Sequence, residues 1–243
     1  MNAPTNENST QNPTRYVASN ARFFKCAMTA SQPPPDRERF ERAAAEFIDA
    51  QRANADRPEA RTTLGSFLVR RGQAVGAETE YKAALQLSPQ YLAASINLAD
   101  LYRQLGRDSE GEAVLRAAIA VSPREAAGHH ALGLTLTRLK KPDAALTEFR
   151  QATELEPDGA RYLYVYAVAL NSAGQAGKAM AVLKEGLARH PSDRDILSAL
   201  ISFSRAAGDS GSALAYAERL AAITPNDRNL ATLIQQLRGA APK

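Results

Sequence analysis

Three histidines are the side chains of this sequence best suited to acid–base or metal chemistry. His129 and His130 are adjacent, and His190 directly precedes Pro191. A metal site would need further ligands, and no aspartate or glutamate stands at helical spacing on the segment that follows Ala126. We therefore predict no metal and no cofactor. His190 is expected at a helix end, where an imidazolium suits the helix dipole.

The other reactive residue types do not form a catalytic pattern either. Serines and acids are scattered, without a nucleophile elbow, a phosphate-binding loop or a pair of carboxylates at a strand end. Cys26 is the only cysteine, which excludes an intrachain disulfide and a zinc site built from thiols. The sequence therefore predicts a protein that is not an enzyme.

Composition narrows the class of partner. The chain has 243 residues, a formal net charge of +4, 44% hydrophobic and 23% charged residues, and no tryptophan. Basic residues run only in pairs such as Arg70-Arg71, whereas nucleic-acid binders carry denser basic stripes with interleaved aromatics. No apolar run is long enough for a membrane span or a signal peptide. A cytoplasmic protein without a membrane span or a nucleic-acid partner is expected.

Prolines recur every 34 residues, at Pro89, Pro123, Pro157, Pro191 and Pro225. A fixed period of this length is typical of a stacked array of supersecondary units. When the proline is given position 32, five repeats follow: residues 58–91, 92–125, 126–159, 160–193 and 194–227. We call them repeats one to five.

Residue size follows the same period. Position 8 holds Gly65, Ala99, Gly133, Ala167 and Ile201, and position 20 holds Ala77, Gly111, Ala145, Ala179 and Ala213. Position 24 holds Tyr81, Leu115, Phe149, Leu183 and Ala217. Small residues at 8 and 20 would let two helices approach closely, while large ones at 24 fill the space beside them. Each repeat is therefore predicted to be a helical hairpin, with repeat five loosely packed because of Ile201 and the pair Ala217 and Leu220.

The turn inside each hairpin also has a signature. Position 15 is Gly72, Gly106, Gly174 and Gly208, and a glycine there can end the first helix in the left-handed region. Repeat three has Lys140 at this position and Pro142 shortly after it. Its turn is therefore expected to close differently.

The two ends of the array differ from the repeats. Residues 1–35 are predicted to be disordered or irregular, and residues 36–57 fit the second helix of a repeat whose first helix would need to cross three prolines. This orphan helix would either be covered by residues 15–30 or present Phe40 and Phe47 as an exposed strip for a partner at the end of the array. Residues 228–243 suit a capping helix and tail, with Asn226 or Asp227 as the helix cap.

The repeat is clearest in three successive segments, RGQAVGAETEYKAALQLSP, LGRDSEGEAVLRAAIAVSP and LKKPDAALTEFRQATELEP. In this pattern the chain resembles the tetratricopeptide repeat family. The resemblance implies an all-α fold: a right-handed superhelix made of the orphan helix, five antiparallel hairpins and the capping helix. It also implies a non-catalytic scaffold for protein–protein interaction. The aromatic residue usual at position 4 is missing, since Arg61, Ser95, His129, Leu163 and Leu197 stand there.

In this family the inner, concave face is lined by positions 2, 5, 6, 9, 12 and 13 of the first helix. The resemblance places eleven residues on that face: Arg70, Asn97, Asp100, Arg103, Gln104, His130, Arg138, Arg161, Tyr164, Asn171 and Arg205. An arginine can bind a carboxylate through two parallel hydrogen bonds, so we expect a peptide or protein partner with acidic groups.

Two other functions stay open at this point. Three segments are similar in sequence to repeats that lie next to multihaem c-type cytochrome regions in some bacterial proteins: AQRANADRPEARTTLG, NLADLYRQLGRD and HHALGLTL. That similarity would imply an accessory segment of an exported, periplasmic electron-transfer assembly, although this chain has no Cys-x-x-Cys-His motif. The second alternative is a phosphate or nucleic-acid binder that uses the arginines. The sequence does not indicate an oligomeric state.

Overall fold

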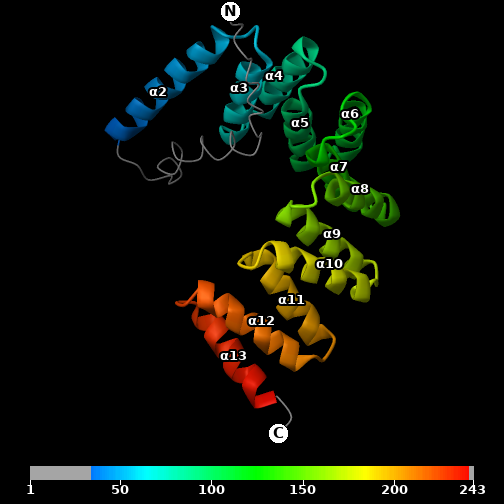
Figure 1. The fold of residues 1–243 in the computed structure, drawn as a ribbon. Helices are drawn as coiled ribbons and strands as arrows, with labels where there is room; N and C mark the ends of the chain where they lie inside the picture. Colours follow the sequence, from blue (N-terminus) through cyan, green and yellow to red (C-terminus); the bar gives the residue numbers. More distant parts are fainter. Residues whose placement is uncertain (1–33, 241–243) are drawn as a thin grey trace, which may run out of the picture. The chain divides into compact units, whose positions relative to one another are not determined.

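The computed structural model describes residues 34–240, and within them twelve helices and no strand are present (Figure 1). The helices are α2 (Pro34–Arg52), α3 (Pro58–Arg70), α4 (Ala74–Leu87), α5 (Leu92–Gln104), α6 (Asp108–Val121), α7 (Ala126–Arg138), α8 (Pro142–Leu155), α9 (Ala160–Ser172), α10 (Ala176–Arg189), α11 (Arg194–Ala206), α12 (Ser210–Ile223) and α13 (Arg228–Ala240). The predicted all-α fold class is confirmed. The chain divides within α5 into an N-terminal part, residues 34–97, and a C-terminal part, residues 98–240.

The helices follow the 34-residue period. The first helix of each repeat begins at position 1, as α7 does at Ala126, and the second ends two residues before the proline at position 32. A proline disfavours the helical conformation of the residue before it. Accordingly, Ser88, which directly precedes Pro89, leaves the helix with φ −147° and ψ 92°. The repeated proline therefore sets where each hairpin stops.

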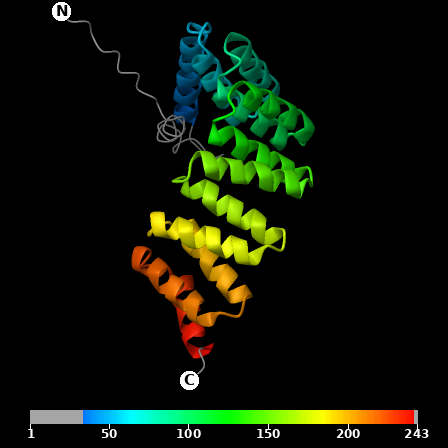
Figure 2. The ribbon, with the colours of Figure 1, turned by 45° about the vertical axis from the view of Figure 1, so that its right-hand side comes forward.

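In the C-terminal part, each helix from α7 to α13 packs against the one before it (Figures 1 and 2). The first helices α9 and α11 also contact each other. The last helix, α13, buries Leu230, Ile234 and Leu237 in a cluster with residues of α11 and α12. Its cap is Asp227, whose Oδ1 accepts hydrogen bonds from the backbone N–H groups of Asn229 and Leu230.

The turn of repeat three closes like the others, so the expectation that it would differ is wrong. Lys140 takes φ 58°, close to the φ values of 72–76° of the four glycines at position 15. The N–H of Lys141 donates to the carbonyl of Leu136 at 2.9 Å, as the N–H of Gln73 does to Leu68 in repeat one. The hydrogen bonds of the turn therefore hold Lys140 in the left-handed conformation, which is unfavourable for residues other than glycine.

Lys140→Gly is expected to raise the free energy of unfolding by about 0.5–1 kcal/mol. The substitution removes the steric cost of the left-handed conformation, and the extra chain entropy of glycine in the unfolded state offsets part of the gain. Urea denaturation measures the change. Lys140→Ala is the control, because alanine loses the charge but keeps the unfavourable backbone. Equal stability of the two variants would contradict the explanation.

The side chains at the facing positions 8 and 24 compensate each other in size: where one is small, the other is large. A Cβ added to Gly65 would lie 2.6 Å from the Tyr81 ring, and one added to Gly133 would lie 2.5 Å from the Phe149 ring. Where position 8 is alanine, position 24 is leucine. Repeat five reverses the order: Ile201 is buried at position 8 and packs in one cluster with Ala217. Ile201 and Ala217 therefore fit each other in size and do not loosen repeat five, while Leu220 packs half-buried against the same cluster.

The orphan helix α2 lies against α3. The rings of Phe47 and Phe67 are 4.9 Å apart, and the guanidinium of Arg71 stands 5.8 Å above the ring of Phe40. Phe40 and Phe47 are half-buried rather than exposed, and a contact of these two rings with a partner stays a prediction. The exposed side of α2 carries Ala43 instead. The other alternative, a cover made by residues 15–30, lies outside the described residues.

Candidate interaction surface

His130 was expected on the inner face, and the structure places it in the interior instead. Its side chain is only 7% exposed and lies between the rings of Phe149, 5.9 Å away on α8, and Tyr162, 5.0 Å away on α9. Neither ring nitrogen has a hydrogen-bond partner among the described residues. Burial, with a smaller contribution from Arg161, lowers the pKa of His130 to about 4. His130 is therefore a neutral packing residue between repeats three and four.

The neighbouring His129 has two partners. Its Nδ1 lies 2.7 Å from Glu148 Oε2, and its Nε2 lies 3.0 Å from the carbonyl oxygen of Pro123. The two histidines thus point into different surroundings and do not share a ligand. No group of three or more His, Cys, Asp or Glu residues within residues 34–240 is placed to hold a metal ion.

Two of the predicted arginines already hold carboxylates. Arg103 donates to Asp100 Oδ1 at 3.0 and 3.2 Å, within the same helix. Arg138 donates to both carboxylate oxygens of Asp108 at 2.7 and 3.3 Å, and Asp108 raises the pKa of the Arg138 guanidinium. Asp108 was missed because it opens a second helix, whereas the concave face was assigned from first helices alone. A ligand would have to displace these acids.

Two other predicted arginines are open. Arg161 at the start of α9 and Arg205 near the end of α11 are exposed, and no described residue forms an ion pair with either. On the same helices, Tyr164 and Asn171 are half-buried, and Tyr164 packs on the core of repeats four and five. The C-terminal part therefore keeps two accessible cations on adjacent first helices.

The remaining predicted residues divide between the two parts of the chain. In the N-terminal part, Asn97 donates to Ser66 Oγ at 3.3 Å, and Arg70 is exposed but engaged in an interaction of its own. In the C-terminal part, Gln104 is exposed at the end of α5. Of the five arginines predicted on the inner face, only Arg161 and Arg205 combine exposure with the lack of a carboxylate partner within residues 34–240.

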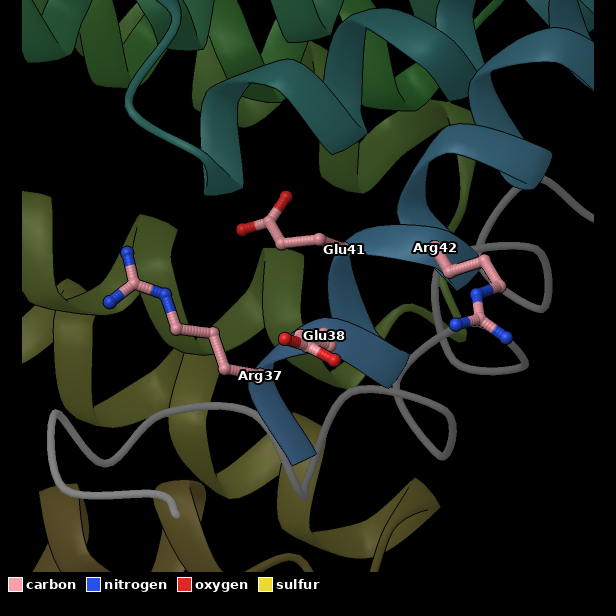
Figure 3. A pocket seen from close by; sticks show the side chains of 4 residues that line it. All are labelled: Arg37, Glu38, Glu41 and Arg42. Atoms are coloured by element: carbon pink, nitrogen blue, oxygen red, sulfur yellow. The ribbon is translucent and has the colours of Figure 1, made fainter. Parts of the chain in front are cut away.

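A charged hollow also lies on α2, lined by Arg37, Glu38, Glu41 and Arg42 (Figure 3). The side chains of Arg37 and Arg42 point away from each other, so they do not converge on one ligand (Figure 3). Glu41 is already bonded to Arg71 at 2.8 Å. We therefore do not consider this hollow a binding site.

Comparison with known proteins agrees with the repeat geometry. Two family models, both described as Tetratricopeptide repeat, match the sequence: one at residues 68–135 and 170–237, the other at residues 36–91 and 130–194. The chain belongs to the tetratricopeptide repeat family. Proteins of this family act in general as non-catalytic scaffolds for protein–protein interaction, so protein partners are the class of ligand to expect. No curated protein matches the sequence.

Solved tetratricopeptide repeat structures share the fold. PilF of Pseudomonas aeruginosa aligns with a TM-score of 0.61 at 16% identity, over 94% of this chain and 97% of its own. PilW, a type IV pilus biogenesis factor, aligns with a TM-score of 0.62 at 22% identity, over 76% and 87%. YrrB, described as having an unusual peptide-binding site, aligns with a TM-score of 0.56 at 18% identity, over 78% and 97%. Among helices α2 to α13, none has the length and apolarity needed to cross a membrane.

Proposed function

We propose that the C-terminal part of this tetratricopeptide repeat protein binds an acidic segment of a protein partner across α9 and α11, without catalysis. The observation that carries the proposal is the exposure of Arg161 and Arg205 without a carboxylate partner in the described chain. A buried charge is stable only when it is paired, so an acidic ligand is favoured over an apolar one at these two positions. The unusual peptide-binding site of YrrB, which has the same fold, supports a peptide as the form of the ligand.

The two arginines suggest how the acids of the ligand are spaced. Arg161 stands at position 2 of its repeat and Arg205 at position 12 of the next. Because α10 runs back between them, α9 and α11 point in the same direction, and ten residues of helix span about 15 Å. An extended peptide covers that length in about five residues. Two acidic residues about five apart are therefore the pattern that we expect.

A peptide array tests this proposal. The array would carry 12-residue peptides with two glutamates at separations of one to nine residues, probed with the full chain. We expect the strongest signal near a separation of five, and a loss of at least about tenfold in affinity for the pair Arg161→Glu and Arg205→Glu, since a central arginine can contribute about 2 kcal/mol.

The matched control reverses two exposed cations of the second helix α10, Lys178→Glu and Lys184→Glu, which changes the net charge equally and, like the test pair, breaks no ion pair within the described residues. Equal weakening in the control pair would mean that only net charge matters. A single-stranded oligonucleotide measured over a range of salt concentrations tests the nucleic-acid alternative. Tight binding with a steep salt dependence would replace the peptide proposal.

A further inference from the structure

His129 ties together three segments of the chain. It stands on α7, its Nδ1 contacts Glu148 on α8, and its Nε2 contacts the carbonyl of Pro123, just after the end of α6. The ring is buried, with 8% exposure. These contacts therefore join both helices of repeat three to the end of repeat two.

The two partners of the His129 ring are both hydrogen-bond acceptors, and this determines how many protons the ring needs to bond both. A backbone carbonyl oxygen can only accept, so Nε2 must carry a proton to bond Pro123. A contact of 2.7 Å between Nδ1 and a carboxylate oxygen needs a second proton. Both contacts are hydrogen bonds donated by the ring only when it holds both protons. A neutral ring would leave a lone pair facing one of the two acceptors.

Repeat one contains the same arrangement with a permanent cation. Arg61 Nε donates to the carbonyl of Ala55 at 2.8 Å, and its Nη1 donates to Glu80 Oε2 at 2.9 Å. Arg61 and His129 both occupy position 4, and Glu80 and Glu148 both occupy position 23. Ala55 and Pro123 are likewise 68 residues apart, two periods of the repeat. The guanidinium supplies both donors at any pH, whereas the imidazole supplies them only when protonated.

We propose that His129 is a proton-dependent clasp: the doubly protonated ring holds α8 and the end of α6 on α7, and its contact with Glu148 on α8 weakens when the ring loses a proton and with it the positive charge. Repeat three then loosens when the pH rises far enough for the ring to lose a proton. Repeat one, with Arg61, does not respond.

The charged groups around the ring are consistent with this assignment. Glu148 on α8 faces Nδ1 directly. Arg124 and Glu125, in the turn between Pro123 and α7, are exposed to solvent. His130, the next residue on α7, faces α8 and α9 through Phe149 and Tyr162, and burial keeps it neutral. With a pKa of about 4, His130 does not change its charge between pH 6 and pH 8.5.

Amide hydrogen exchange on the full chain tests the clasp. From pH 6 to pH 8.5, after correction for the intrinsic exchange rate, protection of the α8 amides is expected to fall about tenfold in the wild type, the loss of one hydrogen bond to a charged group. In His129→Arg, protection of α8 should stay constant. In Arg61→His, the α4 amides should acquire the same pH dependence.

Two further observations keep the proposal falsifiable if His129→Arg does not fold. His129→Gln, which has no titratable group, should show lower but pH-independent protection of α8. In the wild type at pH 6, ¹⁵N spectra of the His129 ring should show both nitrogens protonated. An unprotonated ring nitrogen at pH 6, or parallel pH profiles for the wild type and His129→Gln, would overturn the proposal.

Discussion

Gly133→Ala is expected to lower the free energy of unfolding by about 1–3 kcal/mol, the usual cost of overfilling a packed core. Alanine is the better helix former, so the sign of this effect goes against intrinsic propensity. The cause is the ring of Phe149, whose Cε1 and Cδ1 atoms lie 2.5 and 2.6 Å from the Cβ that alanine would add. Both groups are buried and belong to the two helices of one hairpin, so neither can move aside freely. Urea denaturation monitored by circular dichroism measures the loss.

Two variants show whether the ring is responsible. Gly177→Ala, in the first turn of α10, is the control for the added methyl group, because no atom outside the local helix backbone lies within 4 Å of the added Cβ, and it should not lower the free energy of unfolding. The double variant Gly133→Ala with Phe149→Leu recreates the alanine and leucine of repeats two and four. It should recover most of the lost stability. A double variant whose loss is the sum of the two single losses would show that positions 8 and 24 do not compensate each other.

Acidification is expected to destabilise the protein through His130 by about 3 kcal/mol. The pKa of His130 in the folded protein is about 4, below the ordinary histidine value near 6.5 that applies to the unfolded chain. The unfolded state therefore binds more protons in this range, and stability falls as the pH drops from 6.5 to 4. Well above pH 6.5 the ring is neutral in both states and contributes no pH dependence. Each unit of pKa difference corresponds to about 1.4 kcal/mol.

His130→Leu isolates this contribution. Leucine is similar in size and cannot be protonated, so the difference in unfolding free energy between variant and wild type should grow by about 3 kcal/mol from pH 7 to pH 4. Leucine should also be the more stable side chain at pH 7, since it removes two buried nitrogens without partners. Burial raises the pKa of the neighbouring Tyr162 phenol, so this group stays neutral over the whole range. Parallel curves for the two proteins would contradict the assignment.

The period of the sequence was enough to predict the hairpins. Prolines at position 32 and small residues at positions 8 and 20 act through local geometry, so their effect can be read along one chain. The compensation between positions 8 and 24 is also visible in the sequence, because Gly133 and Phe149 differ from Ala99 and Leu115 in opposite directions of size. Comparing those positions in pairs would have shown that Ile201 fits Ala217.

The errors concern contacts between repeats and conformations imposed by the turn. His130 is covered by Tyr162, a residue of the next repeat, and repeat position alone does not indicate that cover. Arg138 is paired with Asp108 across two repeats. Lys140 takes a glycine-like φ because its turn makes the same hydrogen bonds as the others. A signal for the His129 contact was present, since opposite charges occupy positions 4 and 23 in repeats one and three only.

Because the residues at positions 8 and 24 are matched in size, the place of a crossover between two repeats determines whether the hybrid hairpin is still well packed. A crossover in the loop at a position-32 proline moves both helices of a hairpin together, so the matched pair travels intact. A crossover in the turn at position 15 joins the first helix of one hairpin to the second helix of another. Among repeats one to four, such a chimaera keeps its interior filled only when both parents are odd-numbered, like Gly65 with Phe149, or both even-numbered, like Ala99 with Leu183. Any mixed exchange creates a clash or a void.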